Sequence, residues 1–142
     1  MIKFFCLLLF ASLFGVFNQD SRMHLACHKW KQVGIKSFGK KYQAVSASEK
    51  VMTLGRSGNY EEILYGQMQI KGRWKFNQDS TRLAFEVSEY NGAKVPGGYL
   101  DKMIPTDSVM KLTKDTLIYA SLSYYGPKKV YGHTDWYFVR EK

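Results

Sequence analysis

The side chains that could do chemistry in this chain are few and scattered. His24, His28 and His133 lack the paired spacing that metal-binding histidines commonly show. Cys27 and His28 are adjacent, and adjacent side chains on a strand point to opposite faces of the sheet. A metal site built from Cys27, His28 and His133 would require the two ends of the chain to meet. We therefore expect no metal and no cofactor.

The carboxylates do not suggest an acid–base pair. Glu61, Glu62, Glu86 and Glu89 fall in alternating segments, and we interpret them as solvated positions. The glycines mark turns and form no phosphate-binding loop. Because catalysis requires a nucleophile, a base and an orienting group at one place, we predict that the protein is not an enzyme.

Large apolar side chains at alternate positions are the remaining candidates. Inside a barrel they either fill the core or line a ligand cavity, and core filling is the commoner role. The candidate inward and cavity-lining residues are Trp30, Trp74, Phe76, Phe85, Val87, Leu117, Tyr119, Trp136 and Phe138. Tyr124, Tyr125 and Tyr131, beside Gly126-Pro127, could form an aromatic rim or serve as ordinary strand residues.

Strands must position these side chains, because the chain beyond its first residues alternates with period two and lacks long helical periodicity. Trp74 and Phe76 should point to one face and Arg73 and Lys75 to the other, with a polar turn at residues 77–80. The predicted strands cover residues 29–35, 51–54, 60–65, 68–76, 82–88, 109–112, 117–120 and 136–140.

The predicted fold class is all-β, an up-and-down antiparallel barrel of about eight strands preceded by an N-terminal signal helix. Closing the sheet would remove its exposed edges. Residues 37–48 form a long polar connection, with a short helix expected at 47–50. Residues 90–108 are rich in Gly and Pro, which disfavours an interior strand, and we expect a rim or lid there.

Residues 1–17, MIKFFCLLLFASLFGVF, are typical of a secretory signal peptide. Their apolar run is shorter than the about 20 residues of a membrane-spanning helix. We predict a signal peptide over 1–20, one domain over 27–142, and export to the periplasm, the cell surface or the medium; a retained anchor is the alternative. Cleavage would leave Cys27 as the single cysteine, so no disulfide could form within the chain.

The formal net charge is +9, and loss of Lys3 with residues 1–17 would leave 20 basic against 12 acidic residues, or +8. Such an excess favours anionic partners. Because the basic residues are spread along the chain, a solvated basic surface is the plainer interpretation, and association with an anionic envelope surface is the alternative. With export, we expect no nucleic-acid partner. The sequence does not set the oligomeric state.

Five motifs, in this order and spacing, resemble the lipocalin-like domains of small exported bacterial proteins of the Bacteroidetes type. The resemblance covers roughly residues 27–141. The motifs are Trp30, Gly58-Asn59-Tyr60, Gly72-Arg73-Trp74-Lys75-Phe76, the segment Lys111 to Leu117, and Tyr137-Phe138-Val139-Arg140.

The resemblance implies a calycin-type β-barrel, and it implies that a late arginine packs over the first-strand tryptophan to close one end. Arg140 and Trp30 are the matching residues. Classical lipocalins carry Gly-x-Trp on the first strand, whereas here that position reads His28-Lys29-Trp30 and the complete motif lies at Gly72 to Trp74. Thr134-Asp135-Trp136 is similar to the lipocalin Thr-Asp-Tyr but lies on the last strand, so its role is not transferred.

We therefore expect an exported lipocalin-like protein that binds a small hydrophobic or amphipathic molecule in the cell envelope. This interpretation predicts a hollow, mostly apolar cavity that opens near residues 90–108. The alternative is a non-catalytic envelope module for interaction or structure, with a filled barrel core.

Overall fold

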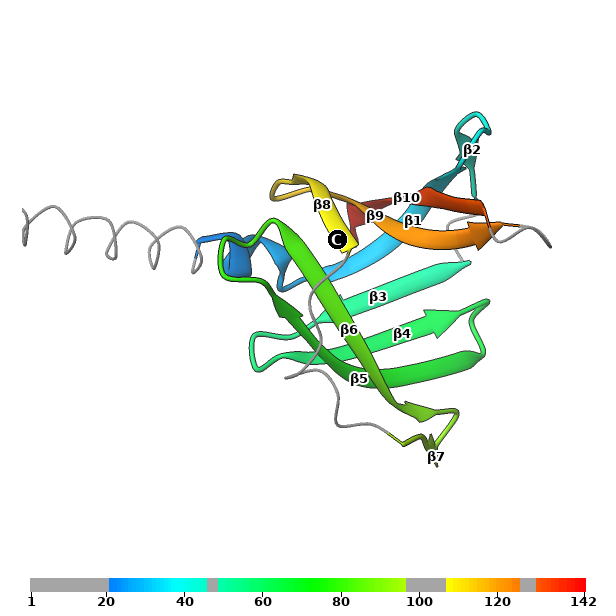
Figure 1. The fold of residues 1–142 in the computed structure, drawn as a ribbon. Helices are drawn as coiled ribbons and strands as arrows, with labels where there is room; N and C mark the ends of the chain where they lie inside the picture. The colour runs from blue at the N-terminus through cyan, green and yellow to red at the C-terminus, as the bar shows by residue number, and fades with distance from the viewer. Residues whose placement is uncertain (1–20, 46–48, 97–106, 126–129) are drawn as a thin grey trace, which may run out of the picture.

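The computed structural model describes residues 21–45, 49–96, 107–125 and 130–142 (Figure 1). Residues 21–26 are helical. The strands are β1 (Lys29–Ser37), β2 (Gln43–Ala44), β3 (Lys50–Leu54), β4 (Asn59–Leu64), β5 (Met68–Phe76), β6 (Arg82–Tyr90), β7 (Ala93–Lys94), β8 (Asp107–Leu112), β9 (Thr116–Tyr125) and β10 (Val130–Arg140). The predicted signal helix at 1–20 lies outside the described residues. Within the described ranges, no helix has the length and apolar character to cross a membrane.

Eight of these strands close into an antiparallel barrel. Their order is β10-β9-β8-β6-β5-β4-β3-β1, and a β10–β1 pairing closes the circle. The short strands β2 and β7 pair with β1 and β6 outside this circle. The predicted all-β class and barrel are confirmed, and the arrangement is compatible with a calycin-like fold. The seam between β6 and β8 is the shortest of the circle, with pairs only at Arg82–Ser108 and Leu83–Asp107.

The predicted strands are present, but several are longer than the alternation suggested. β10 begins at Val130, so His133, Thr134 and Asp135 lie within the strand and not ahead of it. Lys50 opens β3 and does not end the short helix expected at 47–50, of which residues 47 and 48 lie outside the described ranges.

A β-bulge in β1 changes which side chains face the interior. The register of β1 against β10 shifts between Gln32 and Gly34. As a result Gln32 is buried and Ile35 lines the interior pocket described below, although the two are an odd number of positions apart. A Cβ on Gly34 would lie 2.2 Å from the Tyr42 ring, so the glycine makes room for Tyr42 against the strand.

The Gly-x-Trp in β5 has a structural explanation. A Cβ on Gly72 would lie 1.8 Å from the carbonyl oxygen of Glu86, at a register shift between Lys71 and Gly72, so only glycine lets β6 approach this closely. Two positions on, the Trp74 indole N–H donates to the Gly55 carbonyl at 2.9 Å. The motif therefore brings β5 into close contact with β6 and with the turn between β3 and β4.

The barrel has one end that is covered, which we call the closed end. The helical residues 21–26 lie there (Figure 1), with Ala26 1% exposed and Met23 and Cys27 packed against the core. The Trp30 indole N–H donates to the Ala26 carbonyl at 2.8 Å. The buried apolar core comprises Ala26, Trp30, Met52, Leu54, Tyr60, Trp74, Phe76, Leu83, Leu117, Tyr119 and Phe138.

Candidate ligand-binding site

A pocket of about 340 Å³ lies at the opposite end of the barrel, which we call the open end. It is bounded by strands β1, β3, β4 and β10 and by residues between β2 and β3. Its described lining residues are Gln32, Ile35, Val45, Glu49, Lys50, Glu62, Leu64, Tyr65 and Trp136. The volume falls near the lower end of the range of about 300–1,000 Å³ that small-molecule sites show.

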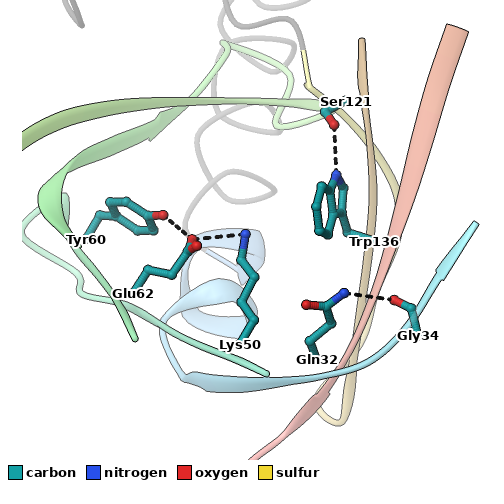
Figure 2. A network of polar contacts seen from close by, with 7 residues as sticks. All are labelled: Gln32, Gly34, Lys50, Tyr60, Glu62, Ser121 and Trp136. Carbon is teal, nitrogen blue, oxygen red and sulfur yellow. Dashed lines mark hydrogen bonds and ion pairs between the residues drawn. The ribbon is translucent and has the colours of Figure 1, made fainter. Parts of the chain in front are cut away.

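A buried ion pair lies in the wall of this pocket. The Lys50 ammonium is 3.0 Å from Glu62 Oε2, and the two side chains are 13% and 7% exposed. The Tyr60 hydroxyl donates a short hydrogen bond to the same carboxylate oxygen. The alternation of β4 places Tyr60, Glu62 and Leu64 on one face, so the carboxylate is directed into the barrel (Figure 2).

Trp136 faces the ion pair from the other wall. The Lys50 Nζ lies 4.6 Å from the centroid of its ring, within cation–π range. The Trp136 indole N–H donates to Ser121 Oγ at 2.8 Å, which fixes the plane of the ring (Figure 2). Tyr119 stacks on Trp136 at 6.5 Å between centroids and on Phe138 at 5.8 Å. The pocket thus rests on a continuous aromatic core.

Besides the Lys50–Glu62 pair, a polar side chain from β1, Gln32, enters the interior. Its side chain is 4% exposed, and its amide N–H donates to the Gly34 carbonyl at 3.5 Å, a long hydrogen bond (Figure 2). Such a weakly held amide can turn toward another acceptor at little cost. Gln32, Lys50 and Glu62 therefore present both donors and acceptors to the pocket.

The tyrosines near the ion pair stay protonated over the ordinary pH range. Burial raises the pKa of Tyr60 far above its usual value, and the charge of Glu62 and the hydrogen bond to it act in the same direction. Burial also raises the pKa of Tyr119, with the charges of Glu62 and Asp107 adding to the effect. Tyr60 therefore serves as a hydrogen-bond donor that holds the Glu62 carboxylate in place.

Eight of the nine predicted cavity-lining residues lie in the interior, at the pocket or in the core. Trp136 borders the pocket, and Phe85 is partly buried against the core. The others that are buried belong to the core beneath the pocket: Trp30, Trp74, Phe76, Leu117, Tyr119 and Phe138.

Val87 differs from its predicted inward position, because its side chain is 39% exposed. Its register partner is Gly72, which has no side chain to cover it. Among the described strands, β6 pairs with β8 only at Arg82 and Leu83, so no strand lies beside Val87 on that side.

The predicted closure pair is brought together only at the level of the backbone. Trp30 and Arg140 are register partners across β1 and β10. Arg140 is exposed, while the Trp30 ring is 0% exposed and meets the His28 ring edge-on at 5.9 Å. Ala26 and His28 both contact the Trp30 indole.

Sequence reasoning missed the polar interior. Glu62 and Glu86, which we expected to be solvated, are 5% and 7% exposed. Glu86 pairs with Arg73 at 2.9 Å on the outer side of the β5–β6 ladder, where the arginine covers it. The spacing Tyr60-x-Glu62-x-Leu64 was the available signal, because it places the carboxylate on the same face as two apolar residues.

The pocket also differs from the expected cavity in character and position. Four of its described lining residues carry charged or amide side chains, so it is not mostly apolar. None of its described lining residues belongs to the described parts of the 90–108 excursion. The rim expected around Tyr124, Tyr125 and Tyr131 concerns side chains outside the description, and Gly126-Pro127 lies outside the described ranges.

Cys27 and His24 lie near Arg56 at the closed end. Burial raises the pKa of the Cys27 thiol, and the nearby Arg56 opposes the shift only in part. The Arg56 guanidinium donates a hydrogen bond to His24 Nδ1 at 2.9 Å. In the described ranges, no group of three or more His, Cys, Asp or Glu side chains is placed to hold a metal ion.

Comparison with known proteins gives no family assignment. No protein-family model matches the chain, and no curated protein matches it at a significant level.

Proposed function

We propose that this protein is an exported, non-catalytic, lipocalin-like carrier that binds a small amphipathic molecule in the open end of its barrel. The observation that carries the proposal is the pocket itself, with apolar walls above a polar cluster of Lys50, Glu62 and Gln32. Such a site suits a ligand whose polar end enters first and whose apolar part contacts Ile35, Val45 and Leu64.

The charges of the pocket favour an uncharged polar end. Lys50 is already neutralised by Glu62, and Glu49 adds a second carboxylate to the described lining. A ligand carboxylate would therefore meet net negative charge in a poorly solvated place. A hydroxyl, carbonyl or amide can accept from the free donors of Lys50 or from Gln32 without that penalty.

Two ligands of equal chain length separate these cases. We expect decanol to bind more tightly than decanoate at neutral pH, as measured by isothermal titration calorimetry on the purified protein. The variant Leu64→Trp, which places a large side chain in the pocket wall, should lose decanol binding. Val139→Trp, at an exposed site near the closed end, is the matched control and should retain it. Equal binding to both variants would refute a ligand site in this pocket.

The natural ligand can be sought by native mass spectrometry of protein purified from the envelope of its own host. A bound small-molecule mass that is present in wild type and absent from Leu64→Trp would support the carrier. The packed half of the barrel favours the second candidate, a structural or interaction module, because Trp30, Trp74 and Phe138 are at most 2% exposed. Repeated isolation without any bound mass, together with no decanol binding, would favour that module.

A further inference from the structure

The exposed aromatic side chains gather at the open end. Among the described side chains, those of Phe38, Tyr42, Tyr65 and Tyr90 are 56%, 50%, 67% and 43% exposed. Phe38 follows β1, Tyr42 precedes β2, Tyr65 lies in the β4–β5 turn and Tyr90 ends β6. In Figure 1 these places lie at the end of the barrel away from the helical residues 21–26. Four exposed aromatic residues therefore lie at the open end, and Tyr65 among them lines the pocket.

Tyr65 is held in a conformation that its side chain disfavours. Its φ is 52° and that of Gly66 is 69°, in a turn closed by a 3.1 Å hydrogen bond from the Gln67 N–H to the Leu64 carbonyl. Asn, Asp and Gly are the usual residues at such positions, and a bulky residue there is strained. Because the ring is 67% exposed, packing within the barrel does not offset this strain.

Phe38 is also fixed in place and still exposed. A Cβ on Gly132 would lie 2.5 Å from Phe38 Cβ and Cγ, so the glycine allows the phenylalanine to rest on β10. Its position is thus set by the barrel wall. An apolar ring that has a fixed position and is more than half exposed is suited to contact with a protein or membrane surface.

Exposed lysines gather at the open end. The segments 36–45, 64–70 and 90–96 contain four exposed lysines and no Asp or Glu; the lysines are Lys36, Lys40, Lys41 and Lys94. Three half-buried acidic side chains lie beside them: Glu49, Glu89, which is the register partner of Lys94, and Asp135, which is the register partner of Lys36. At the closed end, the turns at 77–81 and 113–115 carry exposed residues of both signs, Asp79, Lys114 and Asp115.

We propose that the open end docks on an anionic phospholipid bilayer. Phe38 and Tyr65 enter the headgroup region, where amphipathic aromatic rings are favoured. The four lysines lie opposite the lipid phosphates, where each cation adds to binding. This docking rests on the rim residues and does not require the ligand pocket. It would direct the mouth of the pocket to the bilayer, so that an amphipathic molecule could enter without crossing water.

Flotation with vesicles tests the docking. The full protein after removal of residues 1–20 should float with vesicles that contain phosphatidylglycerol and phosphatidylcholine, and much less with phosphatidylcholine alone. Lys40→Gln with Lys41→Gln should lower vesicle affinity roughly thirtyfold, about fivefold for each lysine. The matched closed-end pair, Lys114→Gln with Lys142→Gln, removes the same charge and should change the affinity by less than about fivefold.

Two further variants separate docking from folding and from ligand binding. Tyr65→Asn should raise thermal stability, since Asn tolerates the positive φ, and should nevertheless weaken vesicle binding. Leu64→Trp should block the pocket and leave vesicle binding intact. Equal losses from the rim and closed-end lysine pairs, or equal flotation with and without phosphatidylglycerol, would overturn the docking. Absence of flotation with either vesicle would overturn it as well.

Discussion

The ion pair inside the barrel allows a quantitative prediction. The Lys50 ammonium and Glu62 Oε2 are 3.0 Å apart, and the side chains are 13% and 7% exposed. At this distance the Coulomb attraction is about 5.5 kcal/mol at an effective dielectric constant of about 20 and about 1.4 kcal/mol in bulk water. Because the pair borders an open pocket, we expect a coupling free energy between these limits, about 3 kcal/mol.

The two single substitutions should not be equivalent. Lys50→Met leaves the Glu62 carboxylate buried with only the Tyr60 hydroxyl as partner, and we expect it to lower the free energy of unfolding by about 3–5 kcal/mol. Glu62→Gln should lower the free energy of unfolding by less than Lys50→Met does. The Lys50 ammonium keeps its contact with the Trp136 ring, and its flexible stem can reach the pocket mouth. The double variant should be destabilised by less than the sum of the two single variants, and this difference is the coupling free energy.

Urea unfolding followed by tryptophan fluorescence measures these free energies, and unchanged m-values would show that the native state stays comparable. The Lys71–Glu89 pair is the matched control, because its atoms are 3.6 Å apart and its side chains are 45% and 32% exposed. We expect coupling of at most about 1 kcal/mol there. A Lys50–Glu62 coupling no larger than that of Lys71–Glu89 would refute the reasoning that the interior pair is poorly screened.

Two other predictions concern the barrel wall and its closed end. Gly72→Ala should lower the free energy of unfolding by about 3 kcal/mol, because the new Cβ would meet the Glu86 carbonyl, and backbone cannot easily move away; an unchanged midpoint in urea would contradict this. Burial and the charges of Arg140 and His24 lower the pKa of His28, so the unfolded state binds more protons below the ordinary histidine pKa, and stability should fall as pH falls from 7 to 5. His28→Gln should lose less melting temperature over that range, and an equal loss in both proteins would contradict the assignment.

The alternation of apolar residues was sufficient to predict the barrel but not its irregularities. Trp74 and Phe76 face the core as their spacing indicated. The bulges at Gln32 and at Val109 depend on the register of the partner strand, which the residues of one strand do not encode. The polar run at His133 to Asp135 precedes the predicted last strand, yet its residues pair with β9. Pairing there is decided by the neighbouring strand and not by local propensity.

The candidate site was hidden for a related reason. Glu61 and Glu62 must face opposite sides of β4, and the pattern favours Glu62 inside only by two apolar neighbours on its face, Tyr60 and Leu64, against one for Glu61, Ile63. The choice is set by Met52, the register partner of Glu62, which is fully buried. Lys50 lies beside a long polar connection, so its place in β3 and its contact with Glu62 depend on tertiary structure. Polar residues inside a barrel are the positions at which hydrophobic patterning is least informative.

The presence of an ion pair in this interior is itself an argument for binding. Replacing a buried ion pair by well-packed apolar residues is often neutral or stabilising, so a barrel that needed only a filled core would not depend on Lys50 and Glu62. The tightly packed half around Trp30, Trp74 and Phe138 can provide stability without them. We therefore expect Lys50→Met with Glu62→Leu to keep most of the free energy of unfolding and to lose decanol binding. If this variant bound decanol as wild type does, the polar cluster would be a structural feature and the ligand would be held by the apolar wall alone.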